Sequence, residues 1–359
     1  MKKAYLILQN GKVFEGWSIG AEGETIGEVV FSTAMTGYVE NLTDPSYYGQ
    51  IICQTFPAIG NYGIMREDFE SDKMQVKGYI VRELCDTPSN FRSQGKLDDL
   101  LKEQNIVGIC GIDTRELTKT LREKGAMNGI ITDSPVLDDK KKKALDEYQI
   151  KDAMDNVSCK QEKVFESQGK QKFNVAMIDY GVKKSVVQKL TKRGCKVVLF
   201  PHTAKAEDVL AIKPDGIMLS NGAGNPEDAK FEVEQIKKLI KSDLPIFAIC
   251  KGHELLATAF GAKTYKLKYG HKGNQPVKDL KSDRVYVSSV NHSYAVEADS
   301  ISDKVATISF RNVNDGSCEG LDYKGKKIFS VQFRPESCEG EMDTGYLYDR
   351  FIENMEDKK

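Results

Sequence analysis

The sequence predicts an α/β protein with two domains: a β-rich N-terminal domain, and a C-terminal domain whose mostly parallel sheet carries helices on both faces. Length is the first reason, because 359 residues suffice for two domains that each bury a core. A change of pattern is the second. Short apolar runs between turn sequences dominate residues 1–150, whereas strands alternate with helical periodicity over residues 173–359. We expect a polar, lysine- and glutamine-rich linker at residues 151–172.

The N-terminal domain has the pattern of several short strands with few helices. Strands are expected at residues 5–8, 12–15, 28–31, 74–84 and 126–132. Asn10 and Gly11 form a strong hairpin turn between the first two. Asp113 followed by Glu116 resembles a capping box and predicts the start of a helix, and the charge run at 138–143 is typical of a solvated helix face. No motif of this half indicates catalysis by itself.

The C-terminal domain alternates between the two kinds of element. Strands are expected at residues 173–178, 196–200, 216–219 and 245–249, and helices at 183–193 and 231–240. Strands that alternate with helices at this spacing form a mostly parallel sheet. Ligands of such sheets bind beyond the carboxyl ends of the strands, so the residues that follow each strand are the candidates for a site.

Cys250 is the first of these candidates. It directly follows the strand at 245–249, and after Gly252 the spacing of Leu255 and Leu256 is helical. A sharp strand-to-helix turn exposes the corner side chain above the helix N-terminus, where the helix dipole favours a thiolate and backbone N–H groups can stabilise an oxyanion. Cys250 is therefore a candidate nucleophile. The alternative is a small buried apolar side chain, as most free cysteines are.

Other segments reach the same predicted edge of the sheet. The loop Ser220-Asn-Gly-Ala-Gly-Asn-Pro226 follows the strand at 216–219, and its glycines allow a close backbone approach to an anionic ligand. It lacks the Gly-Lys-Ser/Thr ending of a phosphate-binding P-loop. Segments 289–294 and 329–336 are further candidates. Taken alone, the loop is a weak motif that also fits a plain glycine-rich turn, and the two later segments favour a solvated turn over a site.

The composition argues against several functional classes. The net charge of −1 gives no basis for binding nucleic acid, and the eight cysteines show no zinc-ligand spacing. The apolar run near the N-terminus is too short for a signal peptide, and no segment approaches the ~20 apolar residues of a membrane span. We expect a cytoplasmic protein with reduced thiols and no metal site.

A series of motifs runs in order through nearly the whole chain. The N-terminal half contains Gly27-Glu-Val-Val-Phe31, Met35-Thr-Gly-Tyr38, Leu42-Thr-Asp-Pro-Ser-Tyr47, Gly60-Asn-Tyr-Gly63, Gly111-Ile-Asp-Thr-Arg115 and Gly125-Ala-Met-Asn-Gly-Ile-Ile-Thr132. The C-terminal half contains Asp179-Tyr-Gly-Val-Lys183, Ser220-Asn-Gly222, residues 255–270 and Asn291-His292. Together they resemble the small, glutamine-hydrolysing subunit of carbamoyl phosphate synthetase. The N-terminal motifs separate it from other class I glutamine amidotransferases, which share only the C-terminal domain.

The resemblance implies a cysteine–histidine–glutamate triad. Cysteine attacks the side-chain amide of glutamine to form a thioester, histidine carries the proton to the departing ammonia, and glutamate orients the histidine. By motif, Cys250 is the nucleophile and Glu336 the orienting acid. The positions implied to bind glutamine or the oxyanion are Ser46, Gly222, Gly224, Asn291 and Tyr294.

The resemblance also implies a partner. A large synthetase subunit, joined to this one as a heterodimer or higher assembly, would receive the ammonia. It would combine it with bicarbonate and two ATP to give carbamoyl phosphate for arginine and pyrimidine biosynthesis. We expect no cofactor on this chain, with the ATP and magnesium sites on the large subunit.

The chain departs from the family pattern at the expected site. The family's Phe-His-Pro-Glu motif reads Phe-Arg-Pro-Glu here, so Arg334 replaces the histidine base. Arginine neither accepts nor returns a proton at physiological pH. Further departures are Lys251, Glu254, Ser293, Ala223 and Asn225. We hypothesise an ion-pair network of Lys251, Glu254, Arg334 and Glu336 that fills the substrate space.

Four interpretations follow from this departure. In the first, the chain is an active glutaminase subunit with a compensating base. In the second, its own hydrolysis is severely weakened, and it still binds its large partner, either to support ammonia-dependent synthesis or as a structural and regulatory subunit. It is otherwise a cysteine hydrolase or sensor acting on another electrophile, or a silent paralogue. Of the four histidines, His253, His271 and His292 fall on positions where the family already has histidine in other roles, and nothing directs His202 toward Cys250.

Overall fold

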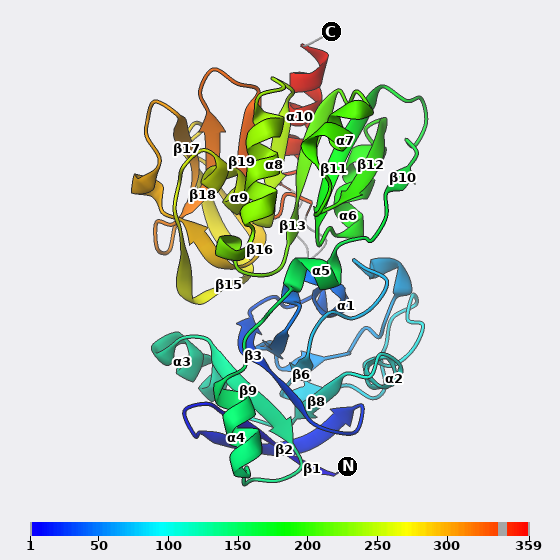
Figure 1. Cartoon of the computed structure of the whole chain (residues 1–359). Helices are drawn as coiled ribbons and strands as arrows, with labels where there is room; N and C mark the ends of the chain where they lie inside the picture. Colours follow the sequence, from blue (N-terminus) through cyan, green and yellow to red (C-terminus); the bar gives the residue numbers. More distant parts are fainter. Residues whose placement is uncertain (1, 337–342, 358–359) are drawn as a thin grey trace. The chain divides into compact units, whose positions relative to one another are not determined.

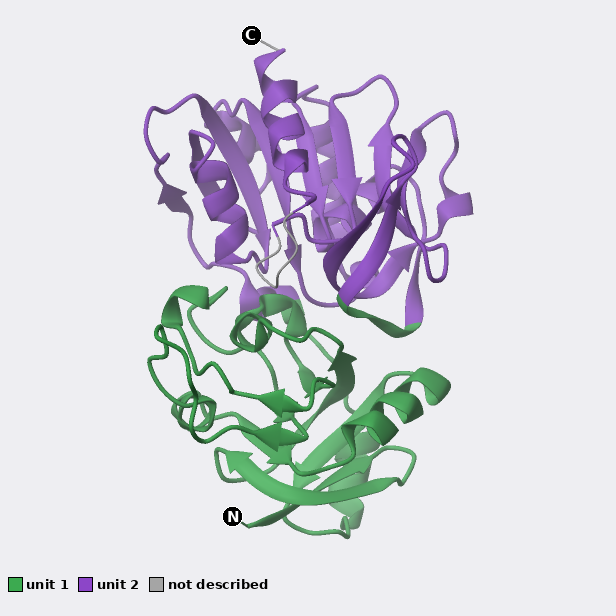
Figure 2. Cartoon of the chain, turned by 180° about the vertical axis from the view of Figure 1, so that it is seen from behind, with its two compact units in different colours: residues 1–153, 268–273 green, residues 154–267, 274–359 purple. Residues whose placement is uncertain are grey.

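A computed structural model describes residues 2–336 and 343–357. The chain forms two compact units, which are coloured separately in Figure 2. Unit 1 contains residues 1–153 and 268–273, and unit 2 contains residues 154–267 and 274–359. None of the described helices has the length and apolar character that a bilayer crossing requires.

Unit 1 is built on a closed β-barrel. Its strands are β1 (Lys3–Leu8), β2 (Val13–Gly20), β3 (Thr25–Ser32), β4 (Gln50–Gln54), β6 (Gly78–Ile80), β8 (Val107–Cys110) and β9 (Met127–Thr132). They close in the order β1-β2-β8-β6-β4-β3-β9. A two-stranded sheet, β5 (Ala58–Ile59) with β7 (Glu83–Leu84), lies outside the barrel. The expected β-rich character of this half is confirmed.

Short helices cover the barrel of unit 1. They are α1 (Tyr38–Thr43), η1 (Pro45–Tyr47), η2 (Arg66–Asp68), α2 (Leu97–Glu103), α3 (Thr114–Lys124) and α4 (Asp139–Asp146). The predicted helix start is confirmed, because the Asp113 side chain accepts a hydrogen bond from the Glu116 backbone N–H at 2.9 Å. The charge run lies on α4, where Leu145 is the only buried residue, as expected of a solvated helix.

The prediction of a single strand at residues 74–84 is wrong. The chain forms β6 and then, after Val81, leaves the barrel. The Val81 N–H still donates to Ile109 O on β8, at 3.0 Å, but the Glu83 N–H donates to Pro57 O, also at 3.0 Å, next to β5. The apolar run therefore serves two sheets, and its periodicity does not show the break.

Unit 2 is a ten-stranded sheet with a parallel centre. Its strands are β10 (Lys163–Phe165), β11 (Phe173–Tyr180), β12 (Cys195–Pro201), β13 (Gly216–Gly222), β14 (Ile246–Ile249), β15 (Thr264–Asp279), β16 (Val285–Val296), β17 (Ala306–Asn312), β18 (Cys318–Tyr323) and β19 (Ile328–Val331). Their order is β10-β12-β11-β13-β14-β19-β18-β16-β15-β17. The strands from β12 to β19 in this order pair in parallel, and antiparallel strands extend the sheet at both ends.

Helices cover both faces of this sheet, as expected (Figure 1). They are α5 (Ala153–Val157), α6 (Lys184–Thr191), α7 (Ala206–Ala211), η3 (Pro226–Asp228), α8 (Lys230–Ile240), α9 (Lys251–Ala259), η4 (Ala298–Ser300) and α10 (Tyr346–Glu356). Helices α7, α8 and α9 pack in one apolar cluster with Ala176 and Ile178 of β11. Helices α6 and α10 pack in another with Val175 and Met177. Successive side chains of β11 therefore point alternately into the two apolar cores, one on each face of the sheet.

The segment expected as a linker, residues 151–172, contains regular structure. Helix α5 spans the division between the units, and β10 pairs antiparallel with β12 at the edge of the sheet. All three residues of β10 are exposed. Because β10 is only three residues long and polar residues surround it, the composition of the whole segment is that of a linker.

Candidate active site

Cys250 lies at a strained corner between β14 and α9. Its backbone has φ +50° and ψ −108°, a conformation that L-residues rarely adopt. The Cys250 N–H donates to Val331 O on β19 at 2.9 Å, and its carbonyl accepts from the Glu254 N–H at 3.1 Å. These bonds hold the corner from both sides. The predicted strand–corner–helix arrangement of a nucleophile is thus present.

Gly252 allows α9 to lie close to the neighbouring strand. A Cβ atom at this position would be 2.4 Å from Leu219 O on β13. Only glycine fits such an approach without a shift of the backbone. The first turn of α9 is thereby placed beside the end of β13, where the loop with Gly222 and Gly224 begins.

The Cys250 thiol is buried and hydrogen-bonded. Its Sγ donates to Asn291 O on β16 at 3.4 Å, and the residue is 2 % exposed. This contact brings the predicted substrate-binding residue Asn291 next to the predicted nucleophile. A thiol held in this way must lose its proton before it can attack a carbonyl group, so the reaction depends on a base nearby.

Lys251 points into the same region. Its Nζ donates to Gly224 O at 2.6 Å and to Glu254 Oε2 at 2.9 Å, and lies 5.7 Å from the centre of the Tyr294 ring. The Lys251 and Glu254 side chains are each 3 % exposed. Glu254 Oε1 also accepts from Gln332 Nε2 at 3.1 Å. The Lys251–Glu254 pair of the hypothesised network is therefore confirmed, and it contacts two predicted substrate-binding residues.

Glu336 is paired with a residue to which the sequence assigned no role. Its Oε1 lies 3.3 Å from Lys183 Nζ, and both side chains are buried. The Lys183 backbone N–H donates to Asn221 Oδ1 at 3.4 Å, just before Gly222. Lys183 is the last residue of the motif Asp179–Lys183. Its position just after a predicted strand was the only feature of the sequence that could have indicated this pairing.

Arg334 occupies the position implied for the base. It is wholly buried, and its N–H donates to Ser289 O at 2.9 Å, so that the two residues form a β-bridge. The guanidinium remains protonated under all physiological conditions. A cation thus stands at the position where the resemblance implies a histidine base.

The histidines of unit 2 have other environments. His253 is completely buried with Nδ1 2.8 Å from Ser330 Oγ, and burial lowers its pKa to about 3, so it is a very weak base. His202 Nδ1 lies 2.7 Å from Glu232 Oε1, and its Nε2 lies 3.3 Å from Asp155 Oδ1. Neither ring supplies a base to Cys250.

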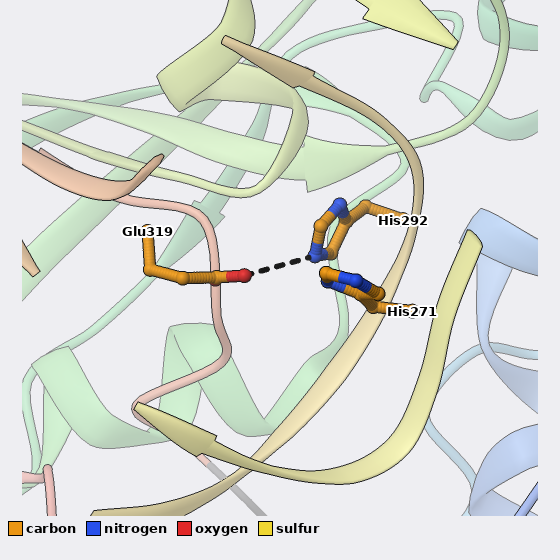
Figure 3. Close-up of side chains that lie close together, drawn as sticks. All are labelled: His271, His292 and Glu319. Carbon is orange, nitrogen blue, oxygen red and sulfur yellow. Dashed lines mark ion pairs between the residues drawn. The ribbon is translucent and has the colours of Figure 1, made fainter. Parts of the chain in front are cut away.

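His292 faces an acidic side chain. Its Nδ1 donates to Tyr294 O at 2.7 Å, and its Nε2 lies 3.6 Å from Glu319 Oε1, as drawn in Figure 3. Both side chains are buried. The ring therefore links β16 to β18, with one nitrogen atom directed to the Tyr294 carbonyl and the other to the Glu319 carboxylate.

The predicted site residues fall into two groups. Asn291, Gly224 and Tyr294 are linked to Cys250 or to the adjacent Lys251 by direct contacts, and Gly222 lies at the end of β13. Ser46 belongs to unit 1, where its backbone N–H donates to Asp44 Oδ1 at 2.9 Å within η1. Within each unit taken alone, the described residues place no three histidine, cysteine or acidic side chains close enough to share a metal ion.

Comparisons with known proteins cover both halves of the chain. Residues 6–131 match the family model of the carbamoyl-phosphate synthase small chain, CPSase domain, and residues 176–354 match class-I glutamine amidotransferase. The chain is 48% identical over 362 residues to the carbamoyl phosphate synthase small chain of Fusobacterium nucleatum, covering 99% of both chains. It is 49% identical over 352 residues to that of Clostridium perfringens, covering 98% of this chain and 99% of the relative. The pyrimidine-specific small chain of Bacillus subtilis is 46% identical over 356 residues, with coverages of 99% and 96%.

Proposed function

Because the chain belongs to the carbamoyl-phosphate synthase small chain family, we propose that it serves a large synthetase chain while its own hydrolysis of glutamine is severely weakened. One observation carries this proposal. Arg334, buried and always charged, stands where the family's base belongs. A cationic charge at this position would favour a cysteine thiolate, but arginine does not protonate the departing amine. Loss of general acid–base catalysis typically costs about 10²–10⁴ in rate.

The partner and the chemistry follow from the family. A small chain implies a large chain, and glutamine is the substrate of the amidotransferase domain. We propose a heterodimer or a higher assembly, with ATP and magnesium bound by the large chain and carbamoyl phosphate delivered to pyrimidine or arginine synthesis. The described free cysteines fit a reducing compartment, so a cytoplasmic location is part of the proposal.

The test compares two nitrogen donors. The chain is combined with the large chain from the same organism, and carbamoyl phosphate synthesis is measured with glutamine and with ammonium. We expect a rate with ammonium that exceeds the rate with glutamine by about 10²-fold or more. Equal rates would refute the weakened hydrolysis.

A matched variant separates a subunit without catalytic action from a slow enzyme. Cys250→Ser removes the nucleophile and keeps the volume of the corner similar. If the residual glutamine-dependent rate disappears, the thiol still acts as a nucleophile. If it does not change, the chain is a structural or regulatory subunit. The buried Lys251–Glu254 pair favours this second possibility, because it already occupies contacts of the predicted substrate residues.

A further inference from the structure

Residues 154–159, the strap, are the first segment of unit 2 and contain most of α5. They contact the carboxyl ends of β11 and β12, which are neighbours in the sheet. The Ser158 Oγ accepts a hydrogen bond from the His202 backbone N–H, directly after β12, at 3.1 Å. The Cys159 N–H donates to Asp179 Oδ2, near the end of β11, at 2.7 Å. The strap is therefore docked at two neighbouring strand ends.

The strap has few apolar side chains that could hold it in place. Ala153, just ahead of it, is the only buried residue of α5. Met154 is partly buried against one apolar cluster of unit 2, and Asp155 and Asn156 are exposed. A helix of five residues is not stable through its own hydrogen bonds. The docking of the strap therefore depends mainly on its polar contacts.

The His202 ring lies between two carboxylates, one of which belongs to the strap. Nδ1 is 2.7 Å from Glu232 Oε1 on α8, and Nε2 is 3.3 Å from Asp155 Oδ1 on α5. An ionised carboxylate only accepts hydrogen bonds, so both contacts are favourable only when both ring nitrogen atoms carry a proton. The protonated ring has two N–H donors, whereas the neutral ring has one. Loss of one proton therefore removes one of the two hydrogen bonds.

The bond that is lost is the one to the strap. Glu232 is closer to the ring and its side chain is 7 % exposed, whereas that of Asp155 is 60 % exposed and can be hydrated instead. The remaining proton therefore stays on Nδ1, and Nε2 presents a lone pair to the Asp155 carboxylate. The Tyr180 phenol near Glu232 stays neutral, because burial raises its pKa. The Lys160 ammonium donates to the backbone carbonyl of Asp155.

We propose that the strap is a pH-dependent latch: the protonated His202 ring holds residues 154–159 on the sheet through Asp155, and loss of the ring proton releases them while the rest of unit 2 stays folded. The hydrogen bond to Glu232, helped by the charges of both acids, raises the pKa of His202 above its ordinary value of about 6.5. The latch is therefore closed at pH 6 and opens as the pH rises through the folded-state pKa. This inference does not depend on the proposed function.

The test is hydrogen exchange of the intact chain between pH 6 and pH 9, corrected for the intrinsic exchange rate at each pH. The Ser158 and Cys159 N–H groups report on the strap, and the amides of β14 report on the centre of the sheet. We expect the protection of the strap to fall about tenfold or more, since a charge-assisted hydrogen bond is lost, and that of β14 to stay constant. Constant protection of the strap, or an equal loss in β14, overturns the latch.

Replacement of Asp155 tests the geometry of the switch. Asp155→Asn supplies an N–H donor for the neutral ring and a carbonyl acceptor for the protonated ring, so this variant should keep the strap protected at both pH values. Asp155→Ala supplies neither and should expose the strap at both. Asp243→Asn, which changes an acid paired with Lys326 at the surface, is the control and should open with pH as the unmodified chain does. Opening of Asp155→Asn with the same pH dependence as the unmodified chain would show that the Asp155 carboxylate is not the switched contact.

Discussion

At the scale of single residues, the proposed site has a cysteine at the position implied for the nucleophile and an arginine at the position implied for the base. Cys250 keeps the strained backbone and the buried thiol that attack requires, whereas Arg334 supplies a fixed charge. The sequence predicted both residues, because each lies inside a motif. It did not predict that Glu336 pairs with Lys183, since the two are far apart in the chain and only the folded sheet edge brings them together.

Restoring the base tests the role of Arg334 directly. Arg334→His should raise the glutaminase rate by about 10²–10⁴, because a group that accepts and returns a proton is reintroduced. Ammonia release from glutamine is the measurement. Arg334→Gln, which removes the charge without adding a base, should give no increase. If histidine gives no gain either, the limiting defect lies elsewhere in the pocket, with Lys251 as the first candidate.

The Lys183–Glu336 pair should matter strongly for stability. Lys183→Met leaves a buried carboxylate without its cation, which typically costs about 3–5 kcal/mol of unfolding free energy. Urea denaturation measures the loss, and Lys183→Met with Glu336→Gln should recover part of it. Lys326→Met breaks the surface pair with Asp243 and should cost less than about 1 kcal/mol. Similar losses for the buried and the surface pair would contradict this interpretation.

At the scale of elements, His202 joins three segments of unit 2. It follows β12, its ring contacts Glu232 on α8 and Asp155 on α5, and its backbone N–H donates to Ser158 Oγ at 3.1 Å. The hydrogen bond to Glu232, helped by the charges of both acids, raises the pKa of His202 above its ordinary value. The ring therefore holds α5 and α8 to the end of β12 more strongly when it is protonated.

This arrangement predicts a pH-dependent stability. Because the folded-state pKa is above the unfolded value of about 6.5, the contribution is complete below that pH and is lost as the pH rises through the folded-state pKa. His202→Gln should thus destabilise the protein more at pH 6 than at pH 8. Thermal unfolding at both pH values is the measurement. An equal loss at the two values would show that the ring contributes by packing alone.

Elements were predicted best where local pattern and tertiary role agree. The β14–α9 corner follows from an apolar run, a cysteine, a glycine and helical spacing, and the structure has this order. The prediction of one strand at residues 74–84 was wrong because the apolar residues of this segment belong to strands of two different sheets. The sequence predicted the surroundings of Lys251 only as an ion pair with Glu254, because the Gly224 carbonyl and the Tyr294 ring come from distant segments.

At the scale of the whole molecule, the alternation of strands and helices predicted the parallel centre of the sheet in unit 2. It did not predict the antiparallel extension by β15, β16, β17 and β18, whose residues have weaker periodicity and are partly exposed. The sequence also did not predict that a later segment of the chain belongs to unit 1. Residues 268–273, in the middle of β15, belong to unit 1, although the rest of this strand belongs to unit 2.

These six residues are integral to unit 1. Lys268 O accepts from the Ala126 N–H at 2.9 Å, Tyr269 stacks on Phe31 with ring centres 5.8 Å apart, and Gly273 lies against Thr33 and Ala34. On the ribosome, the first 153 residues emerge without them. At about 5–20 residues per second, the missing piece follows roughly ten seconds later. Unit 1 must therefore persist without this segment during translation, although the strands of its barrel are already complete. A nascent chain stalled ahead of residue 268 should leave unit 1 sensitive to protease.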